Sequence, residues 1–210
     1  MSIIVHHLEE SRSQRVLWLM EELGLAYEVK RYARNAQTRL APPELKALHP
    51  LGKSPVVERN GRIYAESGAI VEFFAETEAH GALAVLPGDP ARADYLYWLH
   101  FAEGSAMLPL LLKLYVGMLG ENGAPLMQMR IDPEIANHLS FMNAAMAGKD
   151  FFVANRFTAA DIEMSFVLDA AAGRGGLEHY PNLVRVRAGY QSRPAYQRAL
   201  EKGGPYKMGA

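Results

Sequence analysis

Three polar segments in the first third of the chain carry side chains that can bind or activate a ligand. The first spans residues 8–15, where the hydroxyls of Ser11 and Ser13 stand at the start of an apolar helical pattern. A hydroxyl at that place can simply cap the helix, which stabilises it by about 1 kcal/mol. It can also join exposed backbone N–H groups and the positive helix end in holding an anion, such as a thiolate. Both interpretations fit this segment alone.

The second segment spans residues 52–57 and contains Lys53, Ser54 and Pro55. A proline that enters a strand removes one donor from the hydrogen-bond ladder. A cis peptide bond between Ser54 and Pro55 would accommodate the proline and turn the backbone N–H and C=O of Ser54 outward. An extended peptide ligand can pair with groups placed in that way. An ordinary turn with a trans proline is the alternative.

The third segment joins a short predicted strand to a helix at Glu66 and Ser67. Ser67 is expected at the helix N-cap, where its hydroxyl and the following N–H groups can hold a carboxylate. The charge of Glu66 can meet an ammonium group. Because an amino-acid head group carries both charges, the pair predicts a site for one. A plainly capped helix is the alternative.

Composition argues against several classes of partner. The chain has 210 residues, a formal net charge of -1 and no block of Lys and Arg, which argues against nucleic acid and anionic membranes. The longest apolar stretch, residues 107–119, is interrupted by Lys113 and is too short to span a bilayer. The N-terminus has no basic region with a long apolar core, so a cytoplasmic location is expected.

The chain contains no cysteine, which excludes disulfides, a cysteine nucleophile and thiolate metal sites. Any thiol chemistry must therefore use a thiol that arrives on a substrate. The adjacent histidines His6 and His7 point to opposite faces of a predicted strand and make a poor metal site. We therefore predict no metal site.

Hydrophobic periodicity predicts an α/β arrangement around the three polar segments. Alternation indicates strands at residues 3–7, 27–31, 55–58 and 62–64, and helical spacing indicates helices at 11–23, 44–48 and 67–77. Gly24 stands where a glycine ends the first helix, and Asn60-Gly61 predicts a hairpin between the last two strands. The predicted order is β-α-β-α-β-β-α.

The rest of the chain has helical patterns after a Gly-, Ala- and Pro-rich stretch that is typical of a linker. We predict a first domain at residues 1–79, a linker at 80–90 and an all-helical domain at 91–210. Helices are expected at residues 90–117 with a kink at Pro109, and at 133–147, 158–172 and 194–202. Thr158 and Asp161 form a predicted capping box, and Phe157 is expected to pack on Ile162 as a hydrophobic staple.

Taken in order, these segments resemble the cytosolic glutathione transferase family over nearly the whole chain. Residues 11–28 are similar to the family's first helix and second strand, and His-Pro-Leu-Gly-Lys-Ser-Pro-Val-Val at 49–57 resembles its cis-proline segment. Tyr-Ala-Glu-Ser-Gly-Ala-Ile at 64–70 resembles the element that holds the γ-glutamyl group. Residues 157–162 resemble the capping box of a core helix, and residues 98–109 are similar to fungal and bacterial branches.

The resemblance implies an α/β thioredoxin-like N-terminal domain that binds glutathione and an all-α C-terminal domain that binds a second substrate. The residues it implies in glutathione binding are Lys53 and Ser54 for the glycyl and cysteinyl parts, Pro55 for the cis bond, and Glu66 and Ser67 for the γ-glutamyl group. Glu103 would reach the ammonium group from the partner subunit of a homodimer. Glutathione is then a co-substrate, and no metal or redox cofactor is implied.

The group that activates the thiol stays open at the level of the sequence. Many family members use a tyrosine at the end of the first strand, but the first tyrosine here is Tyr27. Others use a serine just before the first helix; an ungapped comparison places that position at Glu10, and a shift of one residue restores Ser11. Ser13 is the second candidate, and backbone N–H groups or Arg12 are the third.

The resemblance therefore predicts a transferase that activates the glutathione thiol as a thiolate for attack on a small hydrophobic electrophile, as in detoxification. A glutathione-dependent disulfide reductase or peroxidase is one alternative, and a non-catalytic binding or regulatory protein of the same fold is another. Candidate walls of the second-substrate site are Tyr97, Phe101, Met107, Leu110, Leu111 and Tyr115. The alternative for these side chains is an ordinary helix core.

Overall fold

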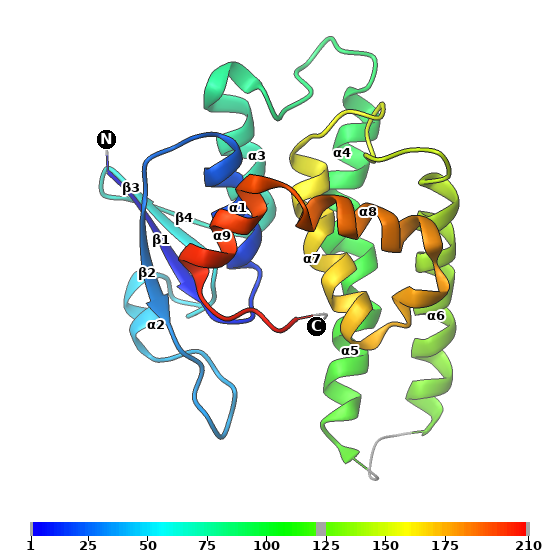
Figure 1. The fold of residues 1–210 in the computed structure, drawn as a ribbon. Helices are drawn as coiled ribbons and strands as arrows, with labels where there is room; N and C mark the ends of the chain where they lie inside the picture. Colours follow the sequence, from blue (N-terminus) through cyan, green and yellow to red (C-terminus); the bar gives the residue numbers. More distant parts are fainter. Residues whose placement is uncertain (1, 121–124, 209–210) are drawn as a thin grey trace. The chain divides into compact units, whose positions relative to one another are not determined.

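The structure is a computed structural model, and it describes residues 2–120 and 125–208 (Figure 1). The chain divides into two compact units. The first contains Met1–Leu86 together with Gln191–Lys207, and the second contains Pro87–Tyr190. Among the described residues, no helix has the length and apolar character needed to cross a membrane.

The first unit is built on a four-stranded mixed sheet in the order β2-β1-β3-β4. β1 pairs in parallel with β2, whereas its pairing with β3 and the pairing of β3 with β4 are antiparallel. The strands are β1 (Ile3–Leu8), β2 (Glu28–Tyr32), β3 (Val56–Arg59) and β4 (Arg62–Ala65), and the helices between and after them are α1 (Ser13–Glu22), α2 (Glu44–Leu48) and α3 (Ser67–Thr77). The predicted order β-α-β-α-β-β-α is confirmed.

The register of the strands brings the three polar segments to one edge of the sheet. His6 near the end of β1 pairs with Val56 at the start of β3, and Val56 pairs with Ala65 at the end of β4. The loop after β1, the loop before β3 and the turn after β4 therefore leave the sheet at the same edge. Segments that are far apart in the sequence are gathered there by pairing alone.

α1 forms where helical apolar spacing was expected, and its apolar side chains enter the core. Val16, Leu17, Leu19 and Met20 are fully buried. The helix starts at Ser13 rather than at residue 11, because the two preceding residues belong to the hydrogen-bonded loop that follows β1. Gly24 has a φ of +65° and follows the last turn, as a C-terminal glycine does.

The C-terminal helix α9 (Pro194–Gly203) belongs to the first unit. The predicted ranges instead assign this segment to an all-helical domain at residues 91–210. α9 lies beside α1 (Figure 1) and is held there by complementary charge. Arg193 binds Glu22 through two N–H groups at 2.6 and 2.9 Å, and Arg198 and Lys202 both pair with Glu21. The boundary after Leu86 falls inside the predicted linker.

Replacing Gly203 with alanine is expected to destabilise the protein by about 1 to 3 kcal/mol, because the packing at this position has no room for a methyl group. An added Cβ would lie 2.9 Å from a methyl carbon of Leu17, 3.0 Å from Gln14 Oε1 and 3.3 Å from His7 Nε2. The control is Gly189→Ala, at a helical position where an added Cβ meets nothing within 4 Å. Urea denaturation checks both variants. Equal urea midpoints would contradict the prediction, because α9 would then shift to make room for the methyl group without a loss of stability.

The second unit contains five longer helices among its described residues. They are α4 (Arg92–Phe101), α5 (Met107–Gly117), α6 (Pro125–Ala145), α7 (Ala159–Arg174) and α8 (Pro181–Gln191). The expected kink near Pro109 takes the form of a π-helical turn at Ala102–Ala106, which separates α4 from α5. Because the proline ring crowds the preceding turn and lacks an N–H, the irregular turn precedes Pro109 instead of being centred on it.

Two helices of this unit differ from the prediction. α6 starts at Pro125 and continues through Pro133, which was expected to begin the helix. The buried side chains of Ile131 and Ile135 on either side of the proline favour the continuous helix by packing. α8 was not predicted, although Leu183, Val186 and Tyr190 are buried at helical spacing. Its hydrophobic pattern is masked by the charged and polar residues between them.

The predicted capping box at the start of α7 is confirmed. The carboxylate of Asp161 accepts the backbone N–H of Thr158 at 2.8 Å and lies within 3.2 Å of its hydroxyl. It also accepts the N–H of Phe152 at 3.0 Å and the hydroxyl of Tyr190 at 2.7 Å. Burial raises the pKa of Asp161 to about 6, although these hydrogen bonds oppose that rise. Asp161 thus joins α7, α8 and the loop before α7.

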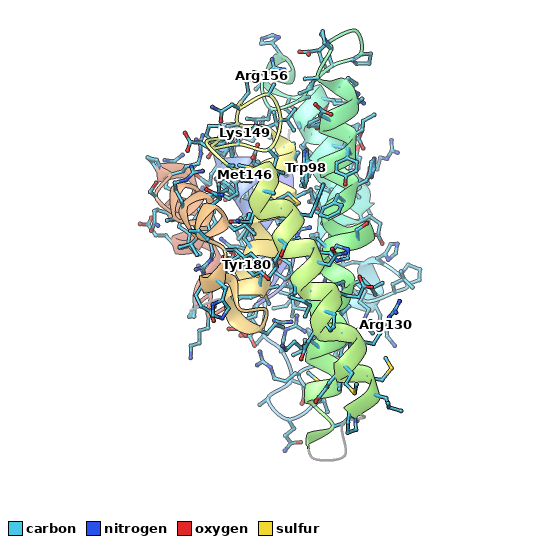
Figure 2. The ribbon with its side chains drawn as sticks, turned by 90° about the vertical axis from the view of Figure 1, so that its right-hand side faces the viewer. Trp98, Arg130, Met146, Lys149, Arg156 and Tyr180 are labelled. Atoms are coloured by element: carbon cyan, nitrogen blue, oxygen red, sulfur yellow. The ribbon has the colours of Figure 1, made fainter. Side chains whose placement is uncertain are left out.

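Aromatic rings fill the space between α4 and α6. Trp98 of α4 is labelled in Figure 2. Its ring stacks on Phe141 of α6 with ring centroids 5.6 Å apart, and its centroid lies 4.6 Å from that of Phe152. Phe101 lies 5.3 Å from Trp98 and 5.7 Å from Phe141. This cluster is an ordinary helix core on its buried side, and it fixes the start of the π-helical turn that follows Phe101.

Candidate functional site

The loop between β1 and α1 forms a buried cluster of hydroxyl groups. The Ser11 hydroxyl donates to the carbonyl oxygen of Leu8 at 2.8 Å, and its oxygen accepts the backbone N–H of Ser13 at 3.2 Å. The two serine oxygens lie 2.7 Å apart. Ser13 is wholly buried, whereas Ser11 keeps 6% of its surface exposed. Of the two predicted candidates, Ser11 is therefore the less deeply buried.

Ser54 joins the same cluster from the loop before β3. Its hydroxyl donates to the carbonyl oxygen of His6 at 3.0 Å and accepts the N–H of Leu8 at 3.3 Å. The same N–H lies 3.2 Å from Ser13 Oγ, so the end of β1 is held between the two hydroxyls. The peptide bond between Ser54 and Pro55 is cis, as predicted. The structure thus brings Ser11, Ser13 and Ser54 together around Leu8.

His7 is part of this cluster, although its sequence position predicts only that it makes a poor metal site with His6. Its Nδ1 lies 2.8 Å from Ser13 Oγ. Burial, with a smaller contribution from the charge of Arg31, lowers the pKa of His7 to about 4. The neighbouring His6 faces the other side of the sheet, where its Nδ1 lies 2.9 Å from the hydroxyl of Tyr32. Alternation along a strand is the signal that separates the two histidines.

The turn between β4 and α3 differs from the prediction in one respect. Ser67 is the first residue of α3, and Glu66 occupies the N-cap position with a φ of 70°. A positive φ is unusual for a glutamate and costs on the order of 1–3 kcal/mol, and such backbone strain is concentrated at functional sites. The buried hydroxyl of Ser67 accepts a hydrogen bond from Arg15 Nη1 at 3.3 Å, which places a buried cation beside the start of α3.

The other predicted site residues lie at different places. Lys53 is exposed in the loop that precedes the cis bond. Arg12 is half-buried at the N-cap position of α1. The ungapped comparison places the family's serine position at Glu10. The side chain of Glu10 instead forms an ion pair with Arg39 at 3.2 Å. Glu103 lies in the π-helical turn of the second unit, and its role in glutathione binding stays a prediction.

The predicted wall residues divide into two groups. Met107 and Leu110 are buried in the core of the second unit, as the helix-core alternative expects. Tyr97 and Tyr115 are each about half exposed, at 48% and 54%. Phe101 and Leu111 are intermediate. The two tyrosines are therefore the members of this set with apolar surface available to a ligand.

Comparison with known proteins identifies the family. The family model described as "Glutathione S-transferase, N-terminal domain" matches residues 11–77, and "Glutathione S-transferase, C-terminal domain" matches residues 106–194. Glutathione S-transferase 1 of Saccharomyces cerevisiae is 32% identical over 223 residues, covering 95% of this chain and 94% of that protein. The chain belongs to the glutathione S-transferase family.

Other members of the glutathione S-transferase family give the same result. Glutathione S-transferase 3 of Schizosaccharomyces pombe is 34% identical over 218 residues, covering 95% of this chain and 87% of that protein. A crystal structure of a glutathione S-transferase from Actinobacillus pleuropneumoniae matches with a TM-score of 0.85 and 30% identity, over 96% of this chain and 92% of that one. The predicted fold class, a thioredoxin-like domain followed by an all-α domain, is confirmed.

More distant structures share the fold alone. The glutathione transferase URE2P8 of Phanerochaete chrysosporium, whose crystal structure contains oxidised glutathione, matches with a TM-score of 0.81 at 20% identity, over 96% of this chain and 94% of that one. In this member of the glutathione S-transferase family, the three polar segments meet at one sheet edge, and the hydroxyl cluster with His7 lies directly beneath it.

Proposed function

We propose that this family member is an enzyme, a glutathione transferase that binds glutathione at the edge of the sheet in the first unit. The observation that carries the proposal is the meeting of Ser11, Ser54 and Ser67 at that edge through the register of β1, β3 and β4. The edge offers hydroxyl groups, helix N-termini and the charge of Arg15. Glutathione is an anionic peptide with a thiol, and these groups complement it.

In this proposal each part of glutathione meets a different segment. Ser54 and Lys53 bind the cysteinyl and glycyl parts beside the cis bond. Glu66 is exposed and binds the ammonium group of the γ-glutamyl part, while Ser67 and the N-terminal N–H groups of α3 bind its carboxylate. The charge of Arg15 behind Ser67 favours a carboxylate over a neutral group at that place.

The Ser11 hydroxyl donates to the thiolate in this proposal, and the positive end of α1 adds to its stabilisation. A glutathione thiol has a pKa near ~8.5, so only a few per cent is ionised at neutral pH. Lowering that pKa by ~2 units corresponds to about 2.7 kcal/mol of preferential thiolate stabilisation. The ionised fraction then rises more than tenfold, and the sulfur becomes an effective nucleophile.

The thiolate then attacks a small hydrophobic electrophile. A carbon–sulfur bond forms, and the leaving group departs with the bonding electrons. For the apolar substrate, the exposed rings of Tyr97 and Tyr115 in the helical domain are separate candidate contacts. The proposal includes a cytoplasmic homodimer with a role in detoxification. In this dimer, Glu103 of the partner subunit binds the ammonium group of glutathione. It uses glutathione as co-substrate and needs no metal or redox cofactor.

The proposal is tested by incubating the purified protein with glutathione and either chlorodinitrobenzene or a small disulfide. Formation of dinitrophenyl-glutathione supports a transferase. Oxidation of two glutathiones to oxidised glutathione, with reduction of the disulfide to its two thiols and without conjugation of the aromatic substrate, supports the reductase alternative. Saturable glutathione binding with neither product supports a binding or regulatory protein.

Glu66→Gln is expected to weaken glutathione binding roughly tenfold to a hundredfold, because a hydrogen bond to a charged group contributes about 1.5–3 kcal/mol. Glu66 is exposed, so the variant should fold. Calorimetric titration with cysteinylglycine, which lacks the γ-glutamyl group, should give equal affinities for both proteins. Glu76→Gln, the same change near the other end of α3, is the control. Equal loss of affinity for both ligands would contradict the assignment of Glu66.

A further inference from the structure

Behind Ser11 lies a chain of buried hydrogen bonds that the proposed reaction does not explain. Ser11 Oγ lies 2.7 Å from Ser13 Oγ, and Ser13 Oγ lies 2.8 Å from His7 Nδ1. The exposed fractions of these side chains are 6%, 0% and 3%. The chain therefore runs from the surface of the site into the interior of the first unit and ends on a titratable ring.

The direction of the donors in this chain depends on which nitrogen of His7 carries the proton. If Nε2 carries it, Nδ1 is an acceptor and the Ser13 hydroxyl must donate to the ring. Ser13 Oγ then accepts a hydrogen bond from the Ser11 hydroxyl, so the Ser11 hydrogen points into the interior. If Nδ1 carries the proton, Ser13 Oγ accepts from the ring, and its own hydrogen can go to Ser11 Oγ at 2.7 Å or to the carbonyl oxygen of Leu8 at 3.2 Å. The shorter contact favours Ser11, so this tautomer allows the Ser13 hydroxyl to donate to Ser11 Oγ.

In the second arrangement the oxygen of Ser11 acts only as an acceptor toward Ser13. Ser11 Oγ accepts from the hydroxyl and from the backbone N–H of Ser13, which lie 2.7 and 3.2 Å away. Both of its lone pairs are then used, and only its hydrogen remains. In the structure that hydrogen goes to the carbonyl oxygen of Leu8 at 2.8 Å. A rotation about the Cβ–Oγ bond of Ser11 redirects it toward a bound sulfur while Oγ keeps its position.

The surroundings of His7 favour a neutral ring held in one position. Burial and Arg31 lower its pKa to about 4, so the ring carries one proton at neutral pH. The ring is fixed between Ser13 on its Nδ1 side and α9 on the other, where an added Cβ at Gly203 would lie 3.3 Å from Nε2. The 2.8 Å contact with the Ser13 hydroxyl orders the ring from its Nδ1 side.

Resting on the proposed function, we propose that His7 and Ser13 are positioning residues for thiol activation. Nδ1–H of His7 holds the Ser13 hydroxyl toward Ser11, so that the Ser11 hydrogen is directed at the sulfur of bound glutathione. His7 stays neutral and does not take the thiol proton, which leaves to solvent. Only Ser11 touches the sulfur.

The test is the pKa of bound glutathione, measured by thiolate absorbance in variants of the two residues. His7→Leu and Ser13→Ala are expected to raise it by about half a unit to one unit, because the Ser11 hydroxyl loses the donor that turns it outward. His7→Asn keeps an N–H near the place of Nδ1 and should restore most of the wild-type value. The control is His6→Leu, an equally buried histidine of β1 that bonds Tyr32 instead, and it should titrate like wild type.

The outcomes separate this proposal from the proposed function. If His7→Leu titrates like wild type while Ser11→Ala raises the pKa, the positioning role is wrong and the proposed function stands. If the wild-type protein binds glutathione without lowering its thiol pKa, the proposed function fails. Affinity for S-methylglutathione, which has no thiol, should stay within about twofold in all variants that fold.

A measurement on the wild-type protein covers the case in which the variants do not fold. Nitrogen NMR of histidine-labelled protein distinguishes the two neutral tautomers of an imidazole ring. With glutathione bound, His7 is expected to carry its proton on Nδ1. A proton on Nε2 in that complex would overturn the proposal, because the Ser13 hydroxyl would then point away from Ser11.

Discussion

Asp161→Ala is expected to lower the free energy of unfolding by about 3 to 5 kcal/mol. The carboxylate is wholly buried, and it accepts the backbone N–H groups of Phe152 and Thr158. The variant leaves these two donors buried without this acceptor and removes the capping box from α7. Because α7 is buried along most of its length, losing its first turn should loosen the whole second unit.

Urea denaturation followed by circular dichroism checks this expectation. Asp94→Ala, at an exposed position in the first turn of α4, is the control and should change the free energy of unfolding by less than about 0.5 kcal/mol. A loss below about 1 kcal/mol in Asp161→Ala would contradict the structural role. Glutathione binding by the remaining folded protein should be unchanged, since Asp161 lies in the second unit.

The ionisation of Asp161 also makes the free energy of unfolding depend on pH. Its pKa is raised from 3.8 to about 6 in the folded protein, so the folded state binds more protons than the unfolded state between these pH values. The protonated carboxyl therefore stabilises the folded state, by about 3 kcal/mol relative to the ionised form. This stabilisation is complete below about pH 4 and is lost as the pH rises through 6. Asp161→Asn removes the titration. The stability of this variant relative to wild type should therefore rise between pH 4 and 7.

Ser11→Ala is expected to raise the pKa of bound glutathione by at least ~1 unit, or about 1.4 kcal/mol, while its affinity for glutathione barely changes. The hydroxyl stands just before α1, on the less deeply buried residue of the Ser11–Ser13 pair. At pH 7 the conjugation rate should fall about threefold, because a thiol pKa raised from ~6.5 to ~7.5 lowers the ionised fraction by that factor. The rate should recover as the pH rises, because the variant forms the thiolate at higher pH.

Stopped-flow conjugation rates and thiolate absorbance between pH 5 and 10 check this prediction. The matched control is Ser165→Ala, which removes another buried hydroxyl, one bonded to the carbonyl oxygen of Ile162 in the second unit. That variant should leave the thiol pKa unchanged. A Ser11→Ala protein with the wild-type thiol pKa would transfer the activating role to backbone N–H groups or to Arg12.

The sequence was sufficient for the elements whose signals are local. The order of β1 to α3 and the capping box of Thr158 and Asp161 were predicted from hydrophobic periodicity and from capping or turn residues within a few positions. The residues alone left the bond before Pro55 open, and the family resemblance implied that it is cis. The three site segments were also identified as separate polar motifs, and the strand register explains why they meet.

The features that were missed depend on contacts between distant residues. The place of α9 in the first unit comes from ion pairs between its basic residues and Glu21 and Glu22, which are far away in the sequence. The N-cap of α3 is Glu66 instead of the predicted Ser67. Glu66 has a positive φ there, and the residue types in this segment do not indicate that conformation. The contact of His7 with Ser13 requires the loop to fold back on β1. Periodicity carries no information about any of these.

The most direct test of the central claim is an ultraviolet titration of glutathione bound to the wild-type protein from acid to alkaline pH. Our account predicts a saturable thiolate absorbance that appears ~2 units below the pKa of ~8.5 of the free thiol. Bound glutathione that titrates like the free thiol would contradict thiol activation and leave a protein that binds glutathione without activating it. Absence of any saturable glutathione signal would contradict the binding site itself.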